Sequence, residues 1–386
     1  MEKAENRNDL KCVYPFLYFA KFMAAFLVSW GHFVTSGTFS TDLHDAGIME
    51  LAAPLLPKEQ HVLWYPDMML ILKLGVLVAS VGVVVFFLIS GFLTPGLQRK
   101  YNGQEIPRLL LSRIARFFPG TLVCTALIGL VMFVGQGVSF PLSSYLITGL
   151  LAQTWIHSVP PITYITWYLV ALMFFYLIAT VVPSFSLKNI TLVYAALYVL
   201  VGFSGAFEET PMAKWFDEIC YVAKFCGIPL LGVAAYELKD KAWSDRLICF
   251  GWFFFLNLGV LRFEAVLHGT EHAYTIVWLY VCAFLVILLA WMIDRAGNWR
   301  GEIVSICKKI DELLLPFYLL HFSFGYNTIY LLRKGNISVY ICLLAAYVVS
   351  FAAAWLASRL TRLLVRMIAC LPRLGGLGKI GKEKRK

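Results

Sequence analysis

Long runs of hydrophobic residues recur along the whole chain, and only short polar stretches separate them. Many runs reach roughly twenty residues, the length that an α-helix needs to cross the hydrocarbon core of a bilayer. Barrel strands would alternate hydrophobic and polar positions, and these runs do not. The pattern predicts an all-α, polytopic integral membrane protein, a single bundle of about ten transmembrane helices that forms one domain over residues 1–386. The expected helices span residues 13–35, 69–97, 117–136, 163–183, 189–206, 218–237, 247–266, 273–293, 312–332 and 336–358.

The charges between the hydrophobic runs predict the orientation of the helices. The second helix is expected to stop at Thr94-Pro95-Gly96, before a basic loop that faces the cytosol by the positive-inside rule. Acidic stretches at 36–66 and 208–217 are expected on the outside, as is the uncharged stretch that includes Ser143, His157, Pro160 and Pro161. By this count the N-terminal residues 1–12 and the basic tail 359–386 both lie in the cytosol.

The amino-acid composition also favours a membrane protein over a soluble one. Hydrophobic residues make up 60% of the chain, more than a soluble domain of this size can bury. The net charge of +10 follows the membrane topology, so we expect no nucleic-acid partner. The nine cysteines form no CxxC motif and no cluster with histidine, so the sequence predicts neither a metal site nor a disulfide framework.

The first hydrophobic run carries two residues that a membrane helix rarely tolerates, Lys21 and His32. They are eleven residues apart, about three helical turns, so both project from one face at a separation of about 16 Å. Imidazole exchanges a proton near neutral pH. We therefore expect this helix to line the active site of a membrane enzyme, with the Lys21 cation toward its first end and His32 toward its last.

Other candidate residues each have a structural alternative. Ser90 adjoins Gly91 in a small-residue notch that either packs helices closely or shapes a ligand channel. Arg113 and Arg116 lie three residues apart at an expected helix start, where they either bind phosphate or anchor the helix on the cytosolic side.

Three further candidates lie in later helices. Trp167 and Tyr168 stand near the outer end of the fourth expected helix, where interfacial anchoring is an alternative to substrate binding. His321 is buried in the ninth helix, either as a functional group or as a hydrogen-bonded structural residue.

Taken together, these motifs resemble the acyltransferase 3 family of bacterial membrane acyltransferases over nearly the whole chain. The shared features are the Lys21–His32 spacing, FFLISGFL (86–93), R-x-x-R-x-x-P (113–119), Trp167-x-Leu169 and YLLH (318–321). Two positions depart from the family pattern. Many members have arginine where Lys21 stands, so bidentate phosphate binding is lost at this point. Many also have glutamate where this chain has Leu172.

The resemblance implies transfer of an acyl group, usually acetyl, from cytosolic acyl-CoA to a hydroxyl of a cell-surface or exported glycan, in the bacterial cytoplasmic membrane. Acetyl-CoA is then the donor co-substrate, held by Lys21, Arg113 and Arg116 with Ser90, and His32 is the general base. His321 would orient the acceptor or shuttle the proton, and Trp167 and Tyr168 would bind substrate. The implied partners are acyl-CoA, membrane lipid and a glycan or lipid-linked sugar acceptor.

Three alternatives remain open at this stage. One is a covalent acyl-histidine relay. Another is a transporter or flippase for a glycan or lipid-linked sugar, although the sequence shows no matched inverted repeats or broken helices. A membrane scaffold is the third, but it gives Lys21 and His32 no reason to be tolerated.

Overall fold

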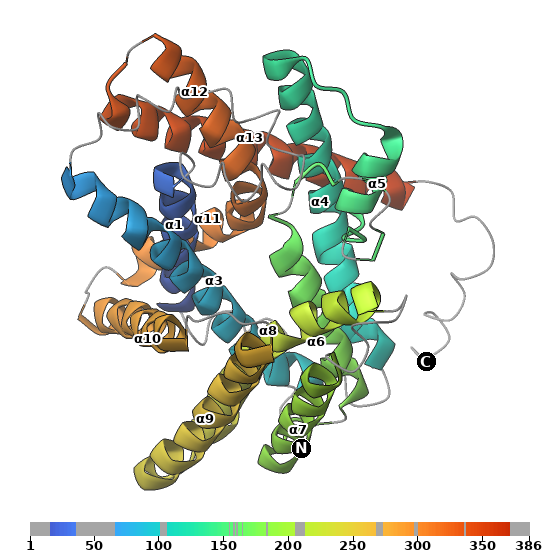
Figure 1. Cartoon of the computed structure of the whole chain (residues 1–386), viewed down its shortest axis with the longest axis vertical. Helices are drawn as coiled ribbons and strands as arrows, with labels where there is room; N and C mark the ends of the chain where they lie inside the picture. Colours follow the sequence, from blue (N-terminus) through green and yellow to red (C-terminus); the bar gives the residue numbers. More distant parts are fainter. Residues whose placement is uncertain are drawn as a thin grey trace.

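The structure is a computed structural model that describes residues 16–35, 66–100, 106–204, 213–267, 273–296 and 300–370, except positions 154, 157, 158, 160, 164, 183 and 336. Within these residues every regular element is a helix, which confirms the all-α prediction (Figure 1). The helices are α1 (Phe16–Thr35), α3 (Pro66–Lys100), α4 (Ile106–Gln136), α5 (Leu142–Gly149), α6 (Trp167–Val181), α7 (Leu187–Ser204), α8 (Ala213–Leu238), α9 (Trp243–Leu267), α10 (Ala273–Ala296), α11 (Arg300–Leu320), the π-helical turn η5 (His321–Gly325), α12 (Tyr326–Lys334) and α13 (Val339–Cys370).

In the described part of the chain, six helices are long and apolar enough to cross a membrane, namely α1, α3, α4, α8, α9 and α13. The apolar helices α6, α7 and α10 contain shorter hydrophobic stretches. These spans agree with the prediction of an integral membrane protein. The number of crossings and the cytosolic position of both ends stay predictions, and residues 1–12 and most of the 36–66 stretch lie outside the described residues.

The predicted stop at Thr94-Pro95-Gly96 is wrong, because α3 continues through Pro95 to Lys100. Proline removes one backbone donor from a helix. Here the Thr94 hydroxyl donates to the Ser90 carbonyl at 2.7 Å, one turn earlier. The Gln98 amide then donates to the Ala179 carbonyl at 2.5 Å, which ties the last turn to the end of α6. These hydrogen bonds thus allow α3 to continue past Pro95, although proline usually ends a helix.

Three other segments expected to be polar loops or tails are helical. The helix α4 begins at Ile106 rather than near 117, and α11 begins at Arg300 rather than near 312. The last helix, α13, extends to Cys370, so the expected tail starts inside a helix; residues 371–386 lie outside the described part. Arginine and lysine have good helix propensity, which lets these helices continue beyond their apolar stretches.

The stretch expected as an uncharged external loop is largely folded against the bundle. Residues 142–149 form α5, which packs on α4 through a hydrogen bond from the Thr121 hydroxyl to the Gly149 carbonyl at 2.6 Å. The Thr148 hydroxyl accepts the backbone N–H of Ile162 at 2.9 Å. Buried polar side chains therefore satisfy the backbone where it leaves the helical form. His157 and Pro160 lie outside the described residues.

Close helix contacts hold α3 at the centre of the bundle (Figure 1). Gly82 lies against the Ala24 carbonyl of α1, and Gly91 lies against the Pro229 carbonyl of α8. A Cβ atom at either glycine would collide with the neighbouring backbone. Small residues allow such close approach between membrane helices. Gly91 therefore has the packing role, while Ser90 beside it faces the candidate site.

Candidate active site

The inner end of the candidate site is an ion pair between α1 and α11. Lys21 Nζ lies 2.9 Å from Asp311 Oδ1, and each side chain is 18% exposed. The ammonium group also lies 5.3 Å from the centre of the Tyr18 ring. The cation in the first helix is thus turned toward groups of the protein.

The outer end is a pair of histidines, His32 on α1 and His321 on the π-helical turn η5 that continues α11. The His32 and His321 rings have centroids 5.2 Å apart, and His321 is completely buried. Phe322 lies edge-on to His32 at 5.5 Å. The structure therefore brings together two predicted catalytic residues that are almost three hundred positions apart in the chain.

These two contacts show that α1 and α11 run parallel and in register. Eleven residues separate Lys21 from His32, and ten separate Asp311 from His321, so both helices rise by about 15 Å between the two levels. Between them Ala25 of α1 packs with Leu314 and Phe317 of α11. An error of one residue in this register would rotate a histidine out of the pair.

The hydrogen bonds of His321 define the chemical state of its ring. Its Nδ1 lies 2.7 Å from the Tyr318 carbonyl and 3.2 Å from the Phe317 carbonyl. A carbonyl can only accept, so Nδ1 carries the hydrogen and the neutral ring has its lone pair on Nε2. Among the described residues Nε2 has no hydrogen-bond partner, although it is buried. A buried lone pair of this kind suits a group that receives a proton or a hydroxyl.

A π-helical turn places His321. The helix α11 passes into η5 at this residue, and η5 ends at Gly325. Such turns are frequent at functional sites because they displace a side chain from the regular helical register. Gly325 has no Cβ and lies against the Phe33 ring, which lets η5 approach α1 closely.

The predicted phosphate-binding arginines lie on α4, and the two differ in environment. Arg113 is 8% exposed, with its guanidinium carbon 4.8 Å from the centre of the Tyr176 ring. Its Nε has no hydrogen-bond partner within the described residues. Arg116 is exposed, and both arginines act electrostatically on Lys21. Since α4 begins at Ile106, neither lies at a helix start, and the predicted contribution of a helix terminus is wrong.

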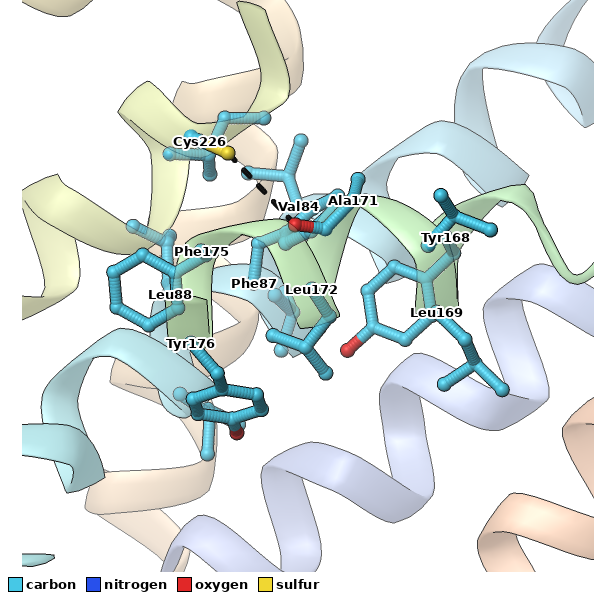
Figure 2. Packing of buried hydrophobic residues seen from close by; sticks show 14 of the residues in the cluster. Val84, Phe87, Leu88, Tyr168, Leu169, Ala171, Leu172, Phe175, Tyr176 and Cys226 are labelled. Atoms are coloured by element: carbon cyan, nitrogen blue, oxygen red, sulfur yellow. Dashed lines mark hydrogen bonds between the residues drawn. The ribbon is translucent and has the colours of Figure 1, made fainter. Parts of the chain in front are cut away.

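The helix α6 connects the two levels of the site. Figure 2 shows Tyr168, Leu172 and Tyr176 along one side of α6, with Ala171 and Cys226 on the other. Tyr168 packs on Tyr318 of α11 at 5.4 Å between ring centroids, and Tyr176 stacks with Arg113. Leu172, where many family members have glutamate, lies buried between them.

The remaining predicted residues lie around Tyr168. Its side chain lies near Ser90 and is buried, so interfacial anchoring does not describe it. Trp167 is partly buried and packs on Phe225 of α8 at 4.7 Å, on a different set of neighbours from the histidines. The structure therefore groups Ser90 and Tyr168 with the site and Trp167 with the core behind it.

Sequence reasoning gave no role to Asp311, Tyr176 or Tyr318, although Tyr318 belongs to the YLLH motif. Asp311 lies just before the expected helix 312–332, yet its distance of ten residues from His321 nearly repeats the distance from Lys21 to His32. That repeated spacing was the available signal. Apart from the place of Tyr318 in that motif, the tyrosines had no signal, because an aromatic residue in a membrane helix is ordinary.

An apolar groove of about 400 Å³ lies between α6 and α7, lined by residues that include Phe174, Ile178, Leu192 and Val193. None of the predicted site residues lines it. The groove therefore does not belong to the candidate site.

The fold and the candidate site together define an integral membrane protein. It holds a pair of imidazoles, His32 and His321, at one end of the contact between α1 and α11. A group of cations, Lys21, Arg113 and Arg116, lies toward the other end. A family model described as an acyltransferase domain, Acyl_transf_3, matches residues 14–359. The chain belongs to this family, which confirms the resemblance of its motifs and makes it a membrane acyltransferase by family. No curated protein and no solved structure matches the chain.

Proposed function

We propose that this protein transfers an acyl group, in the first instance acetyl, from cytosolic acyl-CoA to a hydroxyl of a cell-surface or exported glycan across the bacterial cytoplasmic membrane. The observation that carries the proposal is the line of contact between α1 and α11, from Lys21–Asp311 to His32–His321, which we call the α1–α11 seam. It has a cation at one end and paired imidazoles at the other. Acyl-CoA is a polyanion with a long thin arm that ends in the thioester. Its phosphates would match the cation, and its arm would span the distance from the cation to the imidazoles.

Arg113 supports the donor end of the proposal. A buried guanidinium whose Nε has no partner among the described residues is costly, because burial removes water without replacing its hydrogen bonds. Phosphate oxygens are suitable partners for such a group. Arg113 would hold one phosphate, with Lys21 and exposed Arg116 adding charge, and Ser90 and Tyr168 would face the arm of the donor.

His32 would act as the general base. It accepts the proton of the acceptor hydroxyl while the hydroxyl oxygen bonds to the acyl carbon and the carbon–sulfur bond breaks. The sulfur leaves as the CoA thiolate and takes the proton back from His32. The His321 lone pair supports this assignment, since it lies on the neighbouring ring and can stabilise the imidazolium while the proton is held.

Replacement of His32 tests the assignment. We expect His32→Ala to lower kcat about 10²- to 10⁴-fold, the usual contribution of a general base. The measurement is release of CoA thiol and transfer of labelled acetyl to surface glycan by purified protein. His268→Ala is a matched control, because this histidine falls between the expected helices 247–266 and 273–293, outside the hydrophobic runs. Full transfer by a correctly inserted His32→Ala variant would exclude His32 as the base.

The same assay separates the enzyme from a transporter or flippase. A transporter moves its substrate unchanged and consumes no acyl-CoA. Absence of thiol release by the wild-type protein, with glycan acceptors supplied, would reject the transferase reading for this chain.

A further inference from the structure

The proposed reaction uses the Lys21 cation but leaves its partner, Asp311, without a role. The two groups are in direct contact at 2.9 Å, and both side chains are largely buried. Burial of a charge is costly unless an opposite charge accompanies it. Asp311 therefore supplies the negative charge that Lys21 requires.

The surroundings of the pair are strongly positive. Arg113 and Arg116 both act electrostatically on the Lys21 ammonium group. Among the described residues that act on Lys21, these three cations and the carboxylate of Asp311 leave a surplus of two positive charges at the inner end of the seam. Glu312, the next residue, is 69% exposed and is directed to Arg362 on α13 at 3.7 Å. Asp311 is thus the carboxylate that pairs with Lys21, whereas Glu312 is directed away from these cations.

We propose that Asp311 is the resident counter-ion of the donor site, whose place on Lys21 a phosphate oxygen of the donor takes over. This inference rests on the proposed function, since it takes the polyanionic acyl-CoA as the ligand. Carboxylate and phosphate oxygens accept hydrogen bonds from an ammonium group in the same way. Donor binding is therefore an exchange of one anion for another, and Asp311 lowers the affinity that the cations alone would give.

A purely structural role for Asp311 predicts the opposite result. If the carboxylate only stabilised the α1–α11 seam, its removal would leave donor affinity unchanged or weaken it through local disorder. The sign of the change in affinity therefore distinguishes the two roles.

The experiment is a calorimetric titration of the purified full-length protein with CoA at low salt. We expect Asp311→Asn to tighten CoA binding about tenfold, because a negative charge next to the phosphates is removed in a partly buried setting. Glu312→Gln removes the same charge one residue away and should change the affinity by less than about twofold, since that carboxylate is exposed.

A second comparison guards against poor folding of Asp311→Asn, which leaves Lys21 without its partner. Lys21→Gln should weaken CoA binding, and the double variant Lys21→Gln/Asp311→Asn should bind more tightly than Lys21→Gln alone. A wild-type protein that binds CoA, together with unchanged or weaker binding in both Asp311→Asn variants, would overturn the counter-ion role and leave the proposed function standing. Absence of CoA binding by the wild-type protein would remove the donor assignment and the counter-ion role together.

Discussion

At the scale of single residues, environment rather than residue type separates the candidates. Arg113 and Arg116 have the same side chain and lie three positions apart on α4. Arg113 is buried and stacks on Tyr176, whereas Arg116 is exposed. The first therefore suits direct contact with a ligand, and the second contributes mainly long-range attraction, which salt screens.

This difference predicts unequal effects of one charge change. We expect Arg113→Gln to raise the KM for acyl-CoA about 10- to 100-fold, the usual effect of losing hydrogen bonds to a charged group. Arg116→Gln should raise it by no more than about fivefold, as an exposed charge is worth at most about 1 kcal/mol. Steady-state kinetics on both variants decide the matter, and equal effects would contradict a direct role for Arg113.

At the scale of elements, the site depends on helices that approach more closely than bulky side chains allow. The close contacts of α3 with α1 and α8 occur at Gly82 and Gly91, where a Cβ would meet backbone atoms. Backbone cannot move aside as a flexible side chain can. These glycines thus fix the spacing of the bundle, and through it the position of Ser90 beside Tyr168.

We expect Gly91→Ala to lower the free energy of unfolding by about 1–3 kcal/mol, the usual cost of overpacking. Gly251 on α9 offers a matched control, because nothing lies within 4 Å of a Cβ built there. Gly251→Ala should be neutral or stabilising by up to about 1 kcal/mol, from helix propensity alone. Thermal unfolding of both variants in detergent measures the difference, and similar melting temperatures would argue against close packing at Gly91.

At the scale of the whole molecule, orientation in the membrane decides which end of the seam meets acyl-CoA. Lys21 and Asp311 must lie toward the cytosol if they hold a cytosolic donor, and the histidines then lie toward the outside. The basic residues near the ends of α3 and α13 favour this orientation by the positive-inside rule.

Reporter fusions in a bacterial host test the orientation directly. We expect green fluorescent protein to be fluorescent at both ends of the chain, because it matures in the cytosol and not after export. Alkaline phosphatase inserted at Ser139, in the non-helical connection between α4 and α5, should be active, since the sequence places this stretch outside. A dark C-terminal fusion with a fluorescent N-terminal one would require an odd number of crossings and would invalidate the topology.

The sequence by itself determined the class of protein and most of the helices, because hydrophobic length and charge distribution act locally and need no partner. It also identified Lys21, His32 and His321, because charged and imidazole groups are rare in membrane helices. Helix ends at Pro95 and before Arg113 were misplaced, since contacts with other helices outweighed the local signals.

Only the tertiary structure decided which residues act together. Nothing in the chain order joins Lys21 to Asp311 or His32 to His321, since these pairs arise from the parallel register of two helices far apart in sequence. The same holds for the burial of Arg113 and for the position of Tyr168 between α3 and α11. Hydrophobic pattern determines which segments are buried, but packing between helices determines which of their faces meet.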